Sequence, residues 1–261
     1  MKIGMISNYQ DNGFDYALQN KMEFIEICNN FDPDTERFIN SIPSIKANIE
    51  RTGIAVGSVG RWNHDLNEGG RINPEKLQKY KDELNAAAAI GSDVYVCGVN
   101  RDDSVSLFKN YLAAIDMFSE LVKEAEGKNI KVAVQNCDWN NFIVNPIDWE
   151  IVLGEIPQLT IKYDCSHCYN RGNNYLTELS DWGERISHIH IKGTTHAGGK
   201  RWVDDPPAGM DDIKWGSVFS ILYARKYTGG LSLEPHSGTW HGDLCTKGIQ
   251  FTYDYISKFV F

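Results

Sequence analysis

The chain has 261 residues, of which 42% are hydrophobic, and its net charge at pH 7 is −9. This length suits one large domain with a sizeable core. The acidic balance argues against a nucleic-acid partner, because neutralising phosphates requires a basic face. The sequence has no run of about 18 apolar residues, which argues against a membrane span. Its start turns polar too early for a secretory signal, so a cytoplasmic protein is expected.

Six cysteines are present, and in a cytosolic protein they are expected to be reduced thiols. Cys165 and Cys168 have CxxC spacing. A structural zinc site would need a second such pair, and the sequence contains none. Zinc-ribbon or thioredoxin-like chemistry is therefore not expected.

In the first half of the chain, short apolar runs alternate with longer amphipathic segments. The runs predict strands buried on both faces. The segments between them predict helices, of which the one over 74–90 opens with Pro74, a residue suited to a first helical turn. The predicted strands are 2–6, 22–27, 53–59 and 93–99, and the predicted helices are 14–20, 33–51, 74–90 and 105–127.

The second half repeats the same alternation. The predicted strands are 130–136, 159–164, 188–192 and 230–234, and the predicted helices are 146–155, 173–185, 214–227 and 243–258. Eight strand–helix units of about 33 residues are typical of a single-domain (β/α)8 TIM barrel over residues 1–261. A doubly wound open sheet is the alternative. It usually carries a Gly-rich turn after its first strand, whereas SNYQDNG follows here.

Residues 193–212 form an unusually long connection after the seventh predicted strand, with Gly-Gly and Pro-Pro pairs. Loops after the strands of a barrel surround its active site, and long loops without structure of their own are often lids. A variable surface insertion is the alternative interpretation.

Four consecutive predicted strands end in polar residues that could bind a metal ion. They carry Gln135, Asp164, His190 (with His188) and Glu234. Strand ends of a barrel meet at one rim, so these side chains are expected to lie together. Oxygen and imidazole donors suit one divalent ion, Mn²⁺, Co²⁺, Mg²⁺ or Zn²⁺.

Each of these residues also has a structural interpretation. Asp164 could cap the following turn, and Glu234 could be an ion-pair partner. His188 and His190 point to the same face of the barrel, so one of them is expected to be buried and hydrogen-bonded rather than a ligand.

The sequence also resembles a known family. IKYDCSH, HIHIKG, PPAGMDDIKW and GGLSLEPH are similar to motifs of the xylose-isomerase-like barrel superfamily. This superfamily includes sugar phosphate isomerases and epimerases, ketose 3-epimerases, hydroxypyruvate isomerase, inosose dehydratase and endonuclease IV. The resemblance covers essentially the whole chain and is strongest from residue 130 to 236.

The resemblance implies a Glu, Asp, His, Glu ligand set, which falls here on Gln135, Asp164, His190 and Glu234. The departure is Gln135, since VAVQN replaces a run such as VAIEN. A Gln carbonyl can bind a hard metal but cannot take a proton. In ketose 3-epimerases both glutamates transfer protons, so a single carboxylate base, Glu234, is expected here.

The implied activity is a metal-dependent isomerisation or epimerisation of a small sugar or keto-sugar, phosphorylated or not, through an enediolate or enolate. Glu234 would move the proton, with His167 and Lys192 holding hydroxyls. His236, Trp139 and Trp62 are expected to contact substrate, and Trp202 and Trp240 are further candidates for its apolar walls. His236 and Asp138 are further candidates for a second catalytic group.

Two other classes stay open: a dehydratase or lyase on a keto-sugar or inositol-type substrate, and a non-catalytic metal-binding homologue. Endonuclease IV activity is not expected, because its three-zinc ligand set is largely missing. A small sugar-like molecule is the expected partner, without nucleic acid or membrane, and a homo-oligomer stays open.

Overall fold

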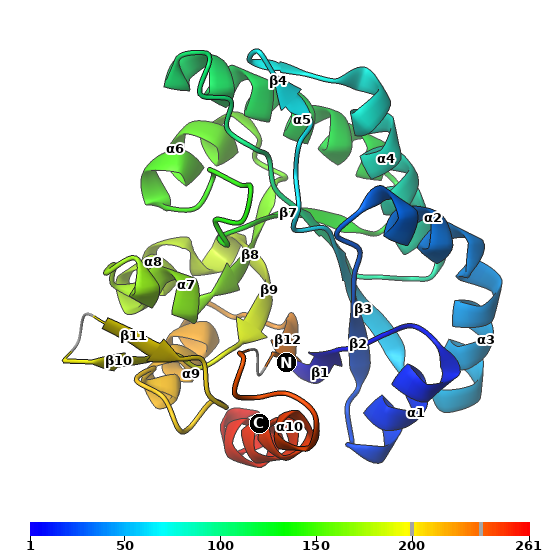
Figure 1. The fold of residues 1–261 in the computed structure, drawn as a ribbon, viewed down its shortest axis with the longest axis vertical. Helices are drawn as coiled ribbons and strands as arrows, with labels where there is room; N and C mark the ends of the chain where they lie inside the picture. Colours follow the sequence, from blue (N-terminus) through cyan, green and yellow to red (C-terminus); the bar gives the residue numbers. More distant parts are fainter. Residues whose placement is uncertain (199–200, 235–236) are drawn as a thin grey trace.

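Eight parallel strands close into a barrel in the computed structural model, which describes residues 1–198, 201–234 and 237–261 (Figure 1). Around the barrel the strands follow the order β1-β12-β9-β8-β7-β6-β3-β2, and β1 closes the ring by pairing with both β12 and β2. Their bounds are β1 (Lys2–Ile6), β2 (Phe24–Cys28), β3 (Ala55–Gly60), β6 (Val94–Cys97), β7 (Lys131–Gln135), β8 (Thr160–Asp164), β9 (Ile186–Ile191) and β12 (Gly230–Leu233). The predicted (β/α)8 barrel is therefore confirmed.

Helices surround the barrel on its outside (Figure 1). They are α1 (Asp11–Gln19), α2 (Asp32–Asn40), α3 (Ile42–Thr52), α4 (Pro74–Ala89), α5 (Leu107–Ala125), α6 (Pro146–Glu155), α7 (Cys165–Asn170), α8 (Tyr175–Trp182), α9 (Trp215–Ala224) and α10 (Asp243–Ile256). Asn73 and Asn145 begin α4 and α6 by accepting backbone N–H groups of the first turn, and each is followed by a proline that needs no such partner. Within the described ranges, no helix is long and apolar enough to cross a membrane.

The helices of the structure differ from the predicted ones in two places. The predicted helix 33–51 is divided into α2 and α3 at Ser41, because Pro43 lacks the N–H that a continuous helix would require. The short helix α7 was not predicted. It begins directly after β8, where the Asp164 side chain accepts the Ser166 N–H.

In the described part of the chain, two small antiparallel strand pairs lie outside the barrel. One pairs β4 (Asn67–Glu68) with β5 (Arg71–Ile72), and the other pairs β10 (Thr195–Ala197) with β11 (Arg201–Asp204). The second hairpin lies in the connection 193–212. This connection therefore contains paired strands, which the sequence did not predict.

A phenylalanine fills the N-terminal end of the barrel interior. A Cβ added at Gly4 on β1 or Gly57 on β3 would lie 2.5 Å from the Phe24 ring, so the two strands that flank β2 need glycine beside this ring. His188 packs edge-to-face on Phe24, with the ring centroids 5.9 Å apart. Polar inward side chains therefore begin above this apolar floor, towards the C-terminal ends of the strands.

Candidate metal and substrate site

Inward-facing polar side chains gather in one half of the barrel, on β2, β8, β9 and β12. Alternate residues of a strand face the same side, so β8 presents Lys162 and Asp164, and β9 presents His188 and His190. The strand register sets Asp164 beside His190. All four side chains are buried. The parallel strands thus bring residues distant in sequence to one polar centre.

Asp164, His190 and Glu234 form the group expected from the strand ends. One donor atom from each lies within 4.8 Å of the others, and His190 Nδ1 is 2.6 Å from Glu234 Oε2. Burial alone would raise the pKa of Glu234, but His190, Lys192 and Lys162 outweigh it and lower the pKa to about 2. Glu234 is therefore an ionised carboxylate at neutral pH.

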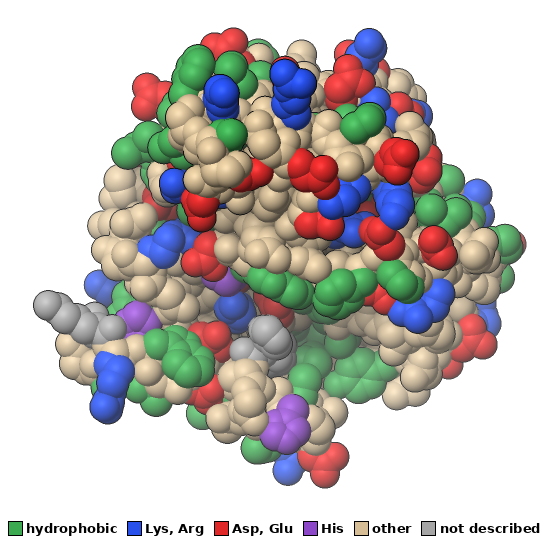
Figure 2. Space-filling view, turned by 45° about the horizontal axis from the view of Figure 1, so that its top comes forward, with side chains coloured by type: hydrophobic (Ala, Val, Ile, Leu, Met, Phe, Trp, Pro, Cys, Tyr) green, Lys and Arg blue, Asp and Glu red, His purple; other side chains and the backbone are tan. Residues whose placement is uncertain are grey.

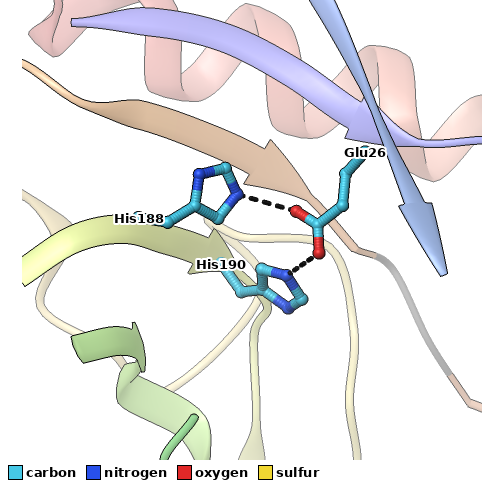
Figure 3. Close-up of side chains that lie close together, drawn as sticks. All are labelled: Glu26, His188 and His190. Carbon is cyan, nitrogen blue, oxygen red and sulfur yellow. Dashed lines mark hydrogen bonds and ion pairs between the residues drawn. The ribbon is translucent and has the colours of Figure 1, made fainter. Parts of the chain in front are cut away.

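Glu26 is a buried residue of the site that sequence reasoning missed. It is fully buried on β2, where it accepts hydrogen bonds from His188 Nε2 at 2.7 Å and His190 Nε2 at 2.8 Å (Figure 3). Burial would raise the pKa of Glu26, yet the two histidines hold it well below its usual range. With its Nε2 proton committed to Glu26, His190 can offer only Nδ1 to a ligand. A carboxylate behind a histidine in this way is typical of metal-binding histidines.

His188 and His190 are both buried and both bond Glu26, but their other contacts differ. His188 lies against Glu26 and the Ser232 hydroxyl, with its ring beside Phe24. Burial would lower the pKa of His190, but Glu26, followed by Glu234, outweighs this effect and raises it. Only His190 belongs to the group with Asp164 and Glu234.

Gln135 is held by a histidine from the connection after β3. Its Nε2 is 3.0 Å from His64 Nε2, and His64 Nδ1 is 2.8 Å from the Tyr80 hydroxyl. Burial, together with Arg61, lowers the pKa of His64 to about 3, so this ring is neutral. The Gln135 amide therefore donates to His64 Nε2 while His64 Nδ1–H donates to Tyr80.

Two buried oxygens of the expected ligands lack a hydrogen-bond donor. They are Gln135 Oε1 and Asp164 Oδ2, judged against the described part of the chain. The nearest cation to Asp164 Oδ2 is Lys192 Nζ at 3.8 Å. Buried acceptors normally have a partner. An ion bound beside Asp164 Oδ2 would supply a partner for that oxygen, so the group of Asp164, His190 and Glu234 fits a divalent metal.

His167 and Lys192 meet beside Asp164. His167 Nε2 is 3.4 Å from Lys192 Nζ and 3.6 Å from Asp164 Oδ2. Burial outweighs Asp164 and lowers the pKa of His167 to about 3, so the ring is neutral and accepts from Lys192. Asp205, from the connection 193–212, lies 4.0 Å from Lys192 Nζ and brings that connection to the site.

A cavity of about 600 Å³ opens at this centre. Trp62 and Trp139 line it, together with Lys162, His167, Lys192 and Glu234. Trp62 also packs on Val94, Val96 and Ala133, so it has a structural role as well. Trp202 and Trp240 bond Asp205 and Asp204 respectively and are not among the lining residues found for the cavity. His236 lies outside the described residues.

The cysteines are free thiols, as predicted. Cys165 and Cys168 are buried on α7, and burial raises the pKa of both. Cys137, Asp138 and His167 form a further group whose donor atoms lie within 4.8 Å of one another. On the face in Figure 2, basic side chains are interspersed with acidic ones rather than gathered in one patch.

Comparisons show the same fold in known proteins. The chain resembles 3-keto-D-glucoside 4-epimerase from E. coli, with 17% identity over 99% of both chains and a TM-score of 0.77. It resembles D-psicose 3-epimerase from Clostridium cellulolyticum H10, solved with D-tagatose, with 14% identity over 100% of this chain and 99% of that one and a TM-score of 0.79. An IOLI protein with a bound zinc atom shares 15% identity over 99% of both chains, with a TM-score of 0.78.

At the level of sequence, no curated relative matches the chain. A family profile, however, matches residues 14–255, which span seven of the eight barrel strands and run from within α1 to within α10. Its description is xylose isomerase-like TIM barrel. The chain belongs to the xylose isomerase-like TIM barrel family.

Proposed function

We propose that the protein is a divalent-metal-dependent isomerase or epimerase of a small sugar or keto-sugar, phosphorylated or not. The observation that carries this proposal is the meeting of Asp164, His190 and Glu234 donor atoms within 4.8 Å, at a cavity of about 600 Å³. That volume suits a small ligand. The sugar epimerases that share the fold support the same class of substrate.

Gln135, Asp164, His190 and Glu234 would hold the ion, which is Mn²⁺, Co²⁺, Mg²⁺ or Zn²⁺. The two buried oxygens without a donor, on Gln135 and Asp164, support this assignment. A bound divalent ion supplies Lewis acidity, which polarises a carbonyl and stabilises an enediolate or enolate.

The remaining chemistry belongs to the side chains. Glu234 is ionised and lines the cavity, so it can accept a proton from a substrate C–H and return it. Lys192 carries a charge, because Asp164, Glu234 and Asp205 outweigh burial and raise its pKa, and it can donate to substrate oxygens. Neutral His167 can orient a hydroxyl, and Trp62 and Trp139 supply apolar walls. His236 stays a predicted substrate contact.

One observation favours a dehydratase or lyase as the second candidate. Gln135 cannot accept a proton, so the ligand set contains one carboxylate base on the β12 side and none on the β7 side. Elimination on one face of a keto-sugar or inositol-type substrate needs only that base. A non-catalytic metal-binding homologue is the third candidate.

Solvent exchange distinguishes the three. The chelator-treated protein, with and without added Mn²⁺, would be incubated in D₂O with D-fructose, D-psicose, D-tagatose and a 3-keto-D-glucoside. An isomerase or epimerase incorporates deuterium at carbon without loss of mass, only with metal, and Glu234→Gln abolishes the exchange. Loss of water instead identifies a dehydratase. Exchange that persists without metal contradicts the proposal, and neither reaction on any substrate favours the binding homologue.

A further inference from the structure

The connection after β7 brings a thiol to the cavity on the side where the expected ligand set has no group that can transfer a proton. Gln135 ends β7, and an amide cannot serve as a base. Cys137 follows it by two residues, is half-buried and lines the cavity, whereas Gln135 is not among the lining residues found. The β7 side of the cavity therefore carries an S–H group in addition to the amide.

Cys137 lies across the cavity from Glu234. In the barrel order β7 is three strands from β12, with β8 and β9 between them, and Figure 1 shows β7 and β12 on opposite sides of the ring. Lys192 follows β9 and His167 follows β8, so both stand nearer to Glu234 around the ring. The β3 side is equally far, but the lining residue found there is Trp62, whose indole is not an acid–base group. A proton delivered to the face opposite Glu234 therefore has to come from the β7 side.

The surroundings of Cys137 suit a group that gives up a proton in the cavity. Its Sγ lies within 4.8 Å of a ring nitrogen of His167 and of a carboxylate oxygen of Asp138. A thiol ordinarily holds its proton at neutral pH. Burial raises the pKa of this thiol, but the ammonium groups of Lys162 and Lys192 oppose the effect and favour the thiolate. The charge that remains after proton transfer is therefore stabilised where it forms.

We propose that Cys137 is the second proton-transfer group of the site, so that Glu234 and Cys137 together invert the configuration at a substrate carbon beside a carbonyl. Cysteine is among the side chains that act as general acids. The inference rests on the proposed function and narrows it, because inversion is epimerisation, whereas an isomerisation that moves a proton along one face needs one base only. It also explains how two-sided chemistry can persist with an amide at Gln135.

Each proton in this reaction has a donor and an acceptor. The Glu234 carboxylate takes the proton of the substrate C–H, and the electron pair of that bond passes into the enediolate. The Cys137 S–H bond then breaks as a new C–H bond forms on the opposite face. Glu234 gives its proton to water and the Cys137 thiolate takes one from water, so no reagent is consumed. In the reverse direction the Cys137 thiolate takes the proton and protonated Glu234 supplies the other.

Deuterium exchange and inversion can be measured separately, which makes the two roles distinguishable. The Mn²⁺-supplemented protein would be incubated in D₂O with D-fructose, D-psicose, D-tagatose and a 3-keto-D-glucoside, and the recovered sugar and its epimer would be quantified by NMR. The variants are Cys137→Ala, Cys137→Ser and, for the neighbouring carboxylate, Asp138→Asn. Cys245→Ser is the matched control, because Cys245 is another half-buried cysteine that lines the cavity, from α10. Circular dichroism verifies that each variant is folded.

We expect Cys137→Ala and Cys137→Ser to form the epimer at least ~10²-fold more slowly than the wild type, the lower end of the range for a general acid. Both variants should still incorporate deuterium into the recovered starting sugar, because Glu234 continues to remove and return the proton on its own face. Misfolding or a lost ligand would abolish the exchange as well. Asp138→Asn and Cys245→Ser should invert and exchange as the wild type does.

Inversion by Cys137→Ala at the wild-type rate would overturn the assignment of Cys137, as would loss of exchange together with inversion in both Cys137 variants. Selective loss of inversion in Asp138→Asn alone would transfer the role to that carboxylate. Deuterium exchange without any epimer in the wild type would overturn the inference but leave a one-base isomerase, so the proposed function would stand. No exchange by the wild type on any of these sugars would contradict both.

Discussion

Replacing Glu26 with Gln should weaken metal binding although Glu26 does not itself belong to the group of expected ligands. Glu26 accepts the Nε2 proton of His190 at 2.8 Å, and the opposite ring nitrogen faces Glu234 at 2.6 Å. A charged acceptor both fixes this tautomer and makes Nδ1 more basic. Glutamine has the same shape but no charge, and its NH₂ group can turn towards either histidine.

The expected loss is 10- to 100-fold in affinity for Mn²⁺, which corresponds to about 1.4–2.7 kcal/mol. The lower value applies if the Gln oxygen still accepts from His190, and the higher value if its NH₂ group faces the ring. Titration calorimetry of Mn²⁺ into chelator-treated protein measures this, with circular dichroism to verify the fold. Glu23→Gln is the matched control, an exposed carboxylate beside the start of the same strand. An unchanged Kd in Glu26→Gln would refute the orienting role.

Three further predictions concern other parts of the molecule. Glu234→Gln should lower kcat at least ~10²-fold in steady-state kinetics, with a modest loss of metal affinity, and an unchanged kcat would contradict the assignment of Glu234 as the base. Gln135→Glu should tighten metal binding without raising the native rate. Substrate should slow limited proteolysis within 193–212, and equal cleavage rates would favour a plain surface segment. Burial raises the pKa of Glu83 to about 7, above the usual 4.5, so its favourable contribution is present at low pH and is lost as pH rises through about 7. Glu83→Gln should therefore raise the free energy of unfolding by up to about 3 kcal/mol at pH near 8 but not at pH near 4. Thermal melting of the variant and the wild type at both pH values measures this, and the same difference at pH 8 as at pH 4 would disprove it.

Much of the barrel was predictable because buried parallel strands are continuous apolar runs, and their ends carry the chemistry. Asp164, His190 and Glu234 meet because each lies within one residue of the C-terminal end of one of three neighbouring strands. The break between α2 and α3 was missed, although Pro43 lies at the position where a continuous helix would lose a hydrogen bond.

Glu26 and Lys162 were missed for a common reason. Each lies inside an apolar run rather than at its very end, and attention to the last one or two positions passes over them. Alternation could have found both, since Glu26 precedes Cys28 by two residues and Lys162 precedes Asp164 by two. The contact between Gln135 and His64 has no such signal, because it joins a strand to a loop 71 residues away.

The most direct test of the central claim is the location of the bound ion. Anomalous diffraction from Mn²⁺-loaded crystals should place one ion about 2.0–2.3 Å from side-chain atoms of Asp164, His190 and Glu234, with Gln135 Oε1 as the fourth protein ligand. An ion found instead at Cys137, Asp138 and His167, or no ion at the strand ends at saturating Mn²⁺, would contradict it.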